Sequence, residues 1–297
     1  MLDRTDDLTA VRRPEVTLEV LPEEPAARPK RLGPLFWIAV GWLLLVTVLA
    51  LVADLLPLDP NALQDAPGRL PSLDHLLGTD ELGRDVLARL IHGARVSLIV
   101  GLSAVAFGLL FGGVLGLLAG YFGGKLDTAV SLFVDSVLAF PYLVFALAAV
   151  TFLGSGLFVV TLSLGIFAIA PNARVVRAAT IQWRNREFVL AAHVLGARTS
   201  RILLREVLRN VAPTMLSYVL VAVAFTIVVE GGLSFLGVSV SPPTPSWGGM
   251  IAAGSATLTD YPLLSVWPSL AMFFTVLALN VAGDRVQDRF EVREGRL

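Results

Sequence analysis

With 297 residues, the chain is long enough for one or two soluble domains, but its composition excludes them. Apolar residues make up 55% of the chain and charged residues 16%, which is too little to cover a water-exposed surface. The absence of cysteine excludes disulfides, iron–sulfur clusters and thiolate zinc sites. The net charge of −1 says little, because in a membrane protein the distribution of charge matters and its sum does not.

Six apolar blocks are long enough to cross the hydrocarbon core of a membrane, which takes about 20 residues. We therefore predict an all-α, polytopic fold with six transmembrane helices. The predicted spans are Leu35–Leu56, Val96–Ala119, Thr128–Phe152, Leu157–Arg174, Pro213–Phe235 and Pro262–Val281. Pro171 and Asn172 are expected to interrupt the end of the fourth.

The distribution of lysine and arginine predicts the orientation of these spans. Nineteen of these residues lie in the N-terminal tail, the second and fourth connections and the C-terminal tail, and only four lie in the remaining connections. Both termini are therefore expected to be cytoplasmic. The first span follows a long, partly acidic tail and is too long for a signal peptide, so we interpret it as an uncleaved anchor.

The spans divide the chain into five predicted parts. These are a disordered cytoplasmic tail (1–34), the first helix (35–56), an external segment (57–95), a five-helix core (96–285) with a cytoplasmic loop (178–211), and a second tail (286–297). In the external segment, Leu82, Val86 and Leu90 share one helical face after acidic residues that suit a helix N-terminus. We expect a helix lying along the membrane surface; a docking surface for an external partner is the alternative.

The loop 178–211 contains two short helical patterns, Glu187–Leu195 and Arg198–Arg209, joined at Gly196. Glycine there favours a sharp turn, because it adopts positive φ without steric cost. The second pattern repeats arginine at spacings of three and four and so forms one basic face. Two interpretations stay open: contact with anionic lipid headgroups, or a rigid elbow for a cytoplasmic partner.

The connection 237–261 is stiffened by prolines and continues into Trp247-Gly248-Gly249-Met250, after which a short helical stretch is expected. We expect an ordered surface loop there rather than a re-entrant segment.

Two carboxylates fall inside predicted spans, Asp135 in the third and Glu230 in the fifth. A charged side chain at the bilayer centre costs about 2.5–3.5 kcal/mol, so each should face protein or water. Both lie within about two turns of a membrane surface, which favours structural pairing or lining of a pathway over proton relay. Pro141, Gly231 and Gly232 are predicted bend points.

Catalytic motifs do not occur in the sequence. The nearest approach to a phosphate-binding P-loop, at residues 119–126, has Ala119 in place of the first glycine and Leu126 in place of the hydroxyl residue. His75, His92 and His193 are far apart in sequence, which argues against a metal site, and none lies in a predicted span. We predict that the chain is not an enzyme.

Several motifs resemble those of permease subunits of ABC importers of the oligopeptide and dipeptide type. They are the run Glu187-Phe-Val-Leu-Ala-Ala-His-Val-Leu-Gly196-Ala, Leu77-Gly-Thr-Asp-Glu-Leu-Gly-Arg-Asp85, Leu233-Ser-Phe-Leu-Gly237, Pro242-Pro-Thr-Pro-Ser-Trp-Gly248 and Asn280-Val-Ala-Gly-Asp284. The resemblance covers about Arg31 to Arg289. Leu190 departs from it, because a glutamate often stands there in the family.

The resemblance implies a type I importer permease fold in the inner (plasma) membrane and a function as half of the pathway for a peptide. The implied partners are a homologous second permease, two P-loop ATPases or one fused ATPase, and an external substrate-binding protein, with no nucleic acid. ATP and magnesium would be bound by the ATPases and no cofactor by this chain. The ATPase-coupling residues would be Glu187, Ala191, Ala192, Gly196 and Arg205.

One alternative from another class remains at this stage: a self-sufficient secondary transporter or channel that uses Asp135 and Glu230. Six spans without an obvious inverted repeat, and a cytoplasmic elbow that such a transporter would not need, count against it. The resemblance leaves open which peptide would be carried, because an external binding protein usually sets specificity in such systems.

Overall fold

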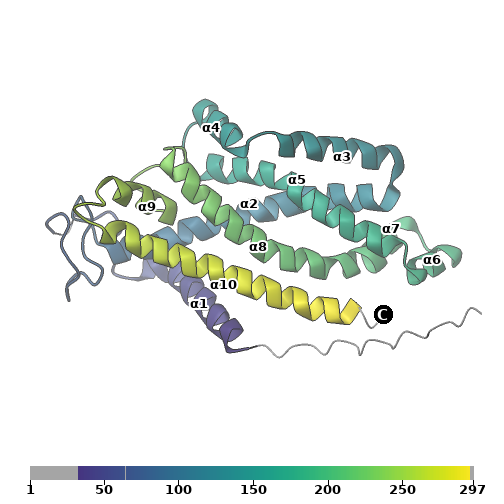
Figure 1. The fold of residues 1–297 in the computed structure, drawn as a ribbon, viewed down its shortest axis with the longest axis horizontal. Coiled ribbons are helices and arrows are strands. Elements are labelled where there is room, and N and C mark those ends of the chain that lie inside the picture. Colours follow the sequence, from purple (N-terminus) through teal and green to yellow (C-terminus); the bar gives the residue numbers. More distant parts are fainter. Residues whose placement is uncertain (1–32, 64, 295–297) are drawn as a thin grey trace, which may run out of the picture.

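The computed structural model describes residues 33–63 and 65–294, and this part of the chain is helical throughout its regular structure. The helices are α1 (Pro34–Val52), η1 (Ala53–Leu55), α2 (Val86–Phe122), α3 (Gly124–Ala139), α4 (Tyr142–Leu153), α5 (Leu157–Arg184), α6 (Glu187–Val194), α7 (Thr199–Arg201), η2 (Ile202–Val207), α8 (Leu208–Phe235), α9 (Trp247–Ala256) and α10 (Leu263–Glu294). Figure 1 shows α2, α5, α8 and α10 running along the long axis, with α9 at one end and α6 at the other.

The most extensive packing joins α2 to α5. Four glycines of α2 at spacings of four, Gly108, Gly112, Gly116 and Gly120, face α5. A Cβ atom at Gly112 would lie 2.9 Å from the amide nitrogen of Ala173 and closer still to a carbonyl oxygen. Small residues at this spacing let two membrane helices approach until their backbones touch. α2 and α5 therefore form one closely packed pair.

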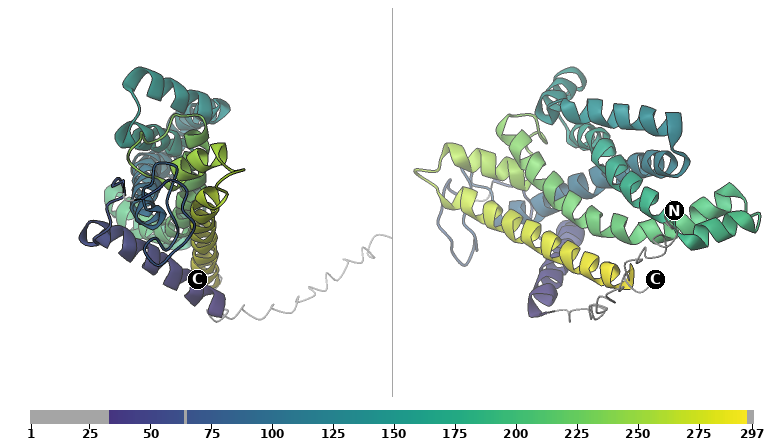
Figure 2. Two further views of the ribbon diagram at one scale, coloured as in Figure 1. Left: turned by 90° about the vertical axis from the view of Figure 1, so that its left-hand side faces the viewer. Right: turned by 45° about the vertical axis from the view of Figure 1, so that its right-hand side comes forward.

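The remaining long helices complete a bundle around this pair. α8 packs against α2, α5 and α10, and α1 packs on α10 and α2. Trp42 of α1 donates a hydrogen bond from its indole nitrogen to the Thr275 hydroxyl of α10, at 3.0 Å. Figure 2 shows α3 and α4 on the side of the bundle away from α1.

The predicted number of spans is confirmed when one bent pair is counted as a single span. Five spans have helices that are long and apolar enough to cross a membrane, and α3 with α4 gives the sixth. The axes of α3 and α4 differ by 81° at a break that contains Pro141. Pro141 is thus confirmed as a bend point, because proline cannot continue the hydrogen-bond ladder of a helix.

Two predicted helix boundaries are wrong. The expected surface helix around Leu82–Leu90 is not separate from the second span, because α2 starts at Val86 and continues unbroken to Phe122. The predicted boundary at residue 95 therefore falls inside a helix, and His92 lies in a helix that can span the membrane. Pro171 does not end α5, which continues to Arg184. Next to it the Asn172 side-chain amide donates to the Ala168 carbonyl at 2.7 Å, so this amide group has a hydrogen-bond partner within its own helix.

The predicted loop 178–211 is mostly helical, and helices are present at both of the predicted helical patterns, as α6 and as the run from Thr199. α5 occupies its start, and α7, η2 and α8 form one continuous helical run from Thr199, in which η2 is a π-helical segment. Only residues 185–198, which include α6, lie outside the two long helices. The predicted N-terminal tail (1–34) lies outside the described residues except for Gly33 and Pro34, and Pro34 already belongs to α1.

The short helical stretch expected in the connection 237–261 is present as α9, which already begins at Trp247. The expected surface position of this segment is wrong, because Trp247 is only 1% exposed. Gly231 and Gly232 are not breaks, because α8 continues through both to Phe235. Gly231 instead permits close packing: a Cβ atom there would lie 3.2 Å from the Met272 methyl group of α10 and 3.9 Å from the Cα atom of Gly248.

Candidate functional site

The short helix α6 projects from the end of the bundle opposite to α9 (Figure 1). It ends in a turn in which the Ala197 amide donates to the Ala192 carbonyl and the Gly196 amide to the His193 carbonyl, both at 3.0 Å. Gly196 has a φ of +77°, which costs other residues about 1–2 kcal/mol. The turn predicted at Gly196 is therefore confirmed, and it fixes where the chain leaves α6.

α6 is attached firmly to the bundle. Val189 of α6 and Ile202 of η2 are buried in one apolar cluster with Trp183 of α5. The Tyr121 hydroxyl of α2 lies 3.0 Å from Nε2 of His193. Close-packed apolar contacts transmit displacement because they leave no free volume to absorb it. α6 is therefore packed against both α5 and η2, the segment that leads into α8.

The outer face of α6 is apolar. We define it by Phe188, Leu190, Val194 and Leu195. Val194 is 88% exposed and Leu195 is 85% exposed. Apolar side chains gathered at one exposed point are typical of a contact with another protein or with lipid. The sequence analysis did not select these residues, although apolar residues at positions 190 and 194 already indicate one helical face.

The predicted coupling residues gather at this end but do not all point outward. Glu187, Ala191 and Arg205 are exposed, whereas Ala192 is half-buried against the apolar cluster. Glu187 is the first residue of α6, where the helix dipole favours a negative charge. Ala192 thus helps to seat α6 on the bundle.

Four arginines form an exposed basic face on the run that follows α6. They are Arg198, Arg201, Arg205 and Arg209. None of their four side chains makes a hydrogen bond or ion pair with the described side chains and backbone of residues 33–63 and 65–289. The predicted basic face is therefore present and open to an acidic partner.

Two ion pairs connect α3 with α5. The Arg174 guanidinium lies 2.6 Å from the Asp135 carboxylate, and both side chains are more than half exposed. Arg177 binds Asp127 through both carboxylate oxygens, and this second pair is more buried. The predicted pairing of Asp135 is confirmed, since its charge is balanced by a cation on the neighbouring helix.

A groove between α4, α5 and α8, which we call the aromatic groove, has a volume of about 280 Å³. Tyr142, Phe167, Tyr218 and Phe225 line it together with aliphatic residues of α2, α5 and α8. The ring centroids of Tyr142 and Phe167 are 5.9 Å apart. Their rings make the wall apolar, and phenol groups add a few polar points, as in sites for small organic molecules.

Glu230 is fully buried where α8 meets α9. Its Oε1 atom accepts hydrogen bonds from the hydroxyls of Ser239 at 2.5 Å, Ser246 at 2.9 Å and Ser234 at 3.3 Å. Oε2 has no hydrogen-bond partner within the described part of the chain, and it lies against Gly248. Glu230 thus holds the N-cap of α9 on α8.

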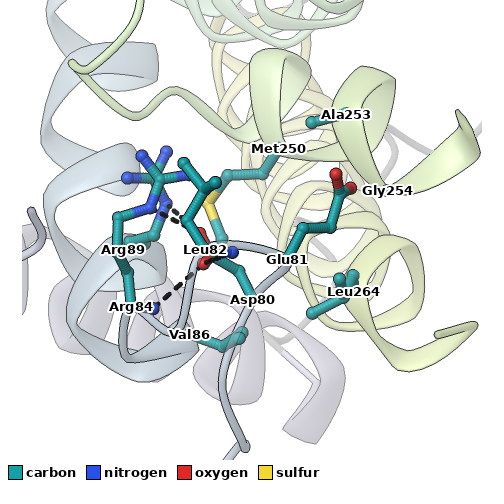
Figure 3. Close-up of a pocket in the computed structure, with 10 residues that line it drawn as sticks. All are labelled: Asp80, Glu81, Leu82, Arg84, Val86, Arg89, Met250, Ala253, Gly254 and Leu264. Carbon is teal, nitrogen blue, oxygen red and sulfur yellow. Dashed lines mark hydrogen bonds and ion pairs between the residues drawn. The ribbon is translucent and has the colours of Figure 1, made fainter. Parts of the chain in front are cut away.

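α9 is fixed on its other side by α2. The Trp247 amide donates to the Ser97 hydroxyl at 3.1 Å, and its indole nitrogen donates to the Leu90 carbonyl at 3.0 Å. Above α9, residues 57–63 and 65–85 form a cap. Figure 3 shows Arg84 of this cap and Arg89 of α2 converging on Asp80 opposite Met250. The pocket between cap and α9 has a volume of about 160 Å³. This end of the bundle is therefore closed by ordered structure.

Among the described residues, no group of three or more histidine, aspartate and glutamate side chains is arranged to hold a metal ion. Comparison with known proteins identifies what kind of bundle this is. Residues 112–295 match the model of the family described as binding-protein-dependent transport system inner membrane component. The chain belongs to this family.

Curated relatives agree with the family. The chain is 36% identical over 221 residues to the glutathione transport system permease protein GsiD of Pectobacterium atrosepticum, covering 74% of this chain and 73% of that protein. It is 38% identical over 242 residues to the di/tripeptide transport system permease protein DppC of Pseudomonas aeruginosa, covering 80% and 77%. The predicted resemblance to ABC-importer permeases is thus confirmed, and the chain is an inner-membrane permease subunit.

The permease fold is confirmed by a solved structure. An inward-facing structure of the MetNI methionine ABC transporter matches with a TM-score of 0.59 and 18% identity, over 70% of this chain and 96% of that one. No finding supports the alternative of a secondary transporter. Permease subunits of this family work with ATPase and substrate-binding partners and a second permease. The exposed outer face of α6 and the aromatic groove are the candidate surfaces for contact with a partner and with the substrate.

Proposed function

We propose that this permease is one membrane subunit of an ATP-driven importer of short peptides. It would form half of the pathway with a homologous second permease, receive substrate from an external binding protein, and be driven by two cytoplasmic P-loop ATPases or one fused ATPase. The names of GsiD and DppC support a peptide substrate. The excess of lysine and arginine in the segments at the α6 end of the bundle supports a cytoplasmic location for that end.

The observation that carries this proposal is the construction of α6. Its outer face presents Val194 and Leu195 to solvent, while Val189 on the other face is buried with Ile202. An apolar tip on a rigid base is suited to dock in a groove of a partner as a short helix. When the ATPases close, they would displace α6 and with it α5 and α8, which line the aromatic groove.

The chain itself is proposed to bind no cofactor. Residues 119–126 lack the glycine and hydroxyl residue that a P-loop needs, so ATP and magnesium would be held by the ATPases. The permease would then be the non-catalytic part of the importer.

The outer face of α6 gives the test. The double variant Val194→Gln and Leu195→Gln removes apolar contacts without placing a charge at the helix end. Leu73→Gln is the matched control, since Leu73 is 96% exposed in the cap at the other end of the bundle. The amount of ATPase that copurifies with a tagged permease should fall at least tenfold in the double variant and should be unchanged in Leu73→Gln. Full copurification with the double variant would refute α6 as the docking element.

A further inference from the structure

The ion pair between Asp135 and Arg174 is too exposed to be in contact with lipid, because charged side chains are costly to place in hydrocarbon. The side chain of Asp135 is 65% exposed and that of Arg174 is 57% exposed. Arg174 lies 17 residues after the start of α5, about 26 Å along its axis, and the hydrocarbon core is about 30 Å thick. The pair therefore lies within or at the edge of the hydrocarbon layer.

Charged side chains at such depths face a protein interior or a water-filled cavity. Neither of these two side chains is buried in this chain, in contrast to Arg177 and Asp127, whose side chains are 32% and 24% exposed. Asp135 and Arg174 must therefore face a space outside this chain that is not lipid: the translocation pathway or the second permease.

The aromatic groove favours the pathway. Phe167 lines the groove and precedes Arg174 by seven residues, so that both lie on one face of α5 about 10 Å apart along its axis. On α8, Tyr218 and Phe225 repeat the same spacing along the groove. A single surface thus begins with aromatic rings and ends, towards α6, with one anion and one cation.

We propose that Asp135 and Arg174 form a transient binding site for a short zwitterionic peptide. The Arg174 guanidinium takes the terminal carboxylate of the peptide, the Asp135 carboxylate takes its terminal ammonium group, and the aromatic groove takes apolar side chains. This inference rests on the proposed function, for which it names the part of the substrate that is recognised.

The charges balance with and without the peptide. In its absence Asp135 and Arg174 neutralise each other across 2.6 Å. When the peptide enters, one internal ion pair is exchanged for two pairs with the ligand, and guanidinium binds carboxylate well because its donors match both oxygens. Because the internal pair competes with the peptide, binding stays weak, and a conduit needs binding that is weak enough to release its substrate.

The absence of cysteine from the chain provides a direct test. Ser131 lines a cavity of about 110 Å³ together with Asp135 and Arg174, so Ser131→Cys places a single thiol of this chain beside the pair. The complete complex of both permeases and the ATPases is reconstituted in nanodiscs, which leave both membrane faces open to solution. Modification of this chain by a cationic, water-soluble thiol reagent is followed by mass spectrometry.

We expect the thiol to react, and a zwitterionic dipeptide to slow the reaction at least threefold. The same dipeptide with an acetylated amino group and an amidated carboxyl group should not slow it. An unreactive thiol would mean that the second permease or lipid covers the pair, and equal protection by both peptides would mean that the charged termini are not recognised. Either result would overturn the inference.

Variants of the pair complete the test. In the Ser131→Cys background, Asp135→Asn and Arg174→Gln should each raise the dipeptide concentration needed for protection at least tenfold. If a single variant leaves an unpaired charge and fails to assemble, the double variant Asp135→Asn and Arg174→Gln replaces both charges by amides and should show the same increase. Asp54→Asn is the matched control, since it removes the exposed ion pair with Arg95, which lies outside this cavity, and should leave protection unchanged.

Uptake of the dipeptide by the unmodified importer is measured in parallel. Uptake without protection overturns this inference alone, whereas absence of uptake contradicts the proposed function itself.

Discussion

The packing of α2 on α5 predicts that a single methyl group added at Gly116 lowers the free energy of unfolding. A Cβ atom at Gly116 would lie 2.9 Å from the Arg177 amide nitrogen and 3.0 Å from the Val176 Cβ atom, and closer still to the Ala173 carbonyl. These atoms belong to a helix backbone and cannot turn aside, so Gly116→Ala must force the helices apart. Overpacking of this kind costs about 1–3 kcal/mol, against a gain in helix propensity of about 1 kcal/mol.

Gly113 is the matched control on the same helix. A Cβ atom there would lie 3.4 Å from the Met215 methyl group, which is the end of a flexible side chain. Gly113→Ala therefore gains helix propensity without the clash, and the two variants should differ in free energy of unfolding by about 1–3 kcal/mol. At about 3 °C per kcal/mol this is roughly 3–9 °C in Tm, measured on the complex in detergent. Equal Tm values for the two variants would refute the backbone contact of α2 and α5.

Three further predictions concern the two ends of the bundle. Trp247→Ala should lower the free energy of unfolding by about 3–5 kcal/mol, whereas Trp37→Ala, at a residue that is 61% exposed, should leave it unchanged; equal Tm values in a thermal melt would contradict the burial of α9. Glu230→Ala removes the acceptor of three serine hydroxyls and should cost about 1–3 kcal/mol, and Glu230→Gln should cost less in the same melt because its amide oxygen still accepts; the reverse order would contradict these hydrogen bonds. Gly196→Ala should strain the turn after α6 by about 1–2 kcal/mol and reduce ATPase copurification, and unchanged copurification would show that the turn is not needed for docking.

Much of the fold could be predicted because lipid imposes a simple rule. Each span had to be a long apolar helix, and Pro141 marked the break between α3 and α4. The turn at Gly196 was also predictable, since few residues accept its positive φ. The close approach of α2 and α5 was readable from glycines at spacings of four, although the sequence analysis did not use this signal.

The rest depends on contacts between segments that are distant in sequence. The burial of Trp247 needs Ser97 and Leu90 of α2, and nothing within the connection 237–261 indicates them. A helix around Val86 was predicted, but its continuity with the second span was missed because its first turns carry polar residues such as Arg89, which pairs with Asp80 of the cap. The partner of Asp135 could not be selected among many arginines before α3 and α5 were placed side by side.

Likewise, the site could be predicted only as a region. The residues predicted to contact the ATPase lie on α6 and the run after it, and their role stays a prediction. Ala192 is half-buried against the bundle, and the exposed residues Val194 and Leu195 were not selected. A helical pattern gives the faces of a short helix, whereas its neighbours decide which face is covered.

The most direct test of the account is ATP-driven uptake of a labelled dipeptide into proteoliposomes that contain this permease, its second permease, the ATPases and the binding protein. The account predicts uptake that requires ATP, that is lost in the Val194→Gln and Leu195→Gln double variant, and that persists in Leu73→Gln. Uptake by this chain alone that follows a proton gradient and requires Asp135 or Glu230 would contradict it.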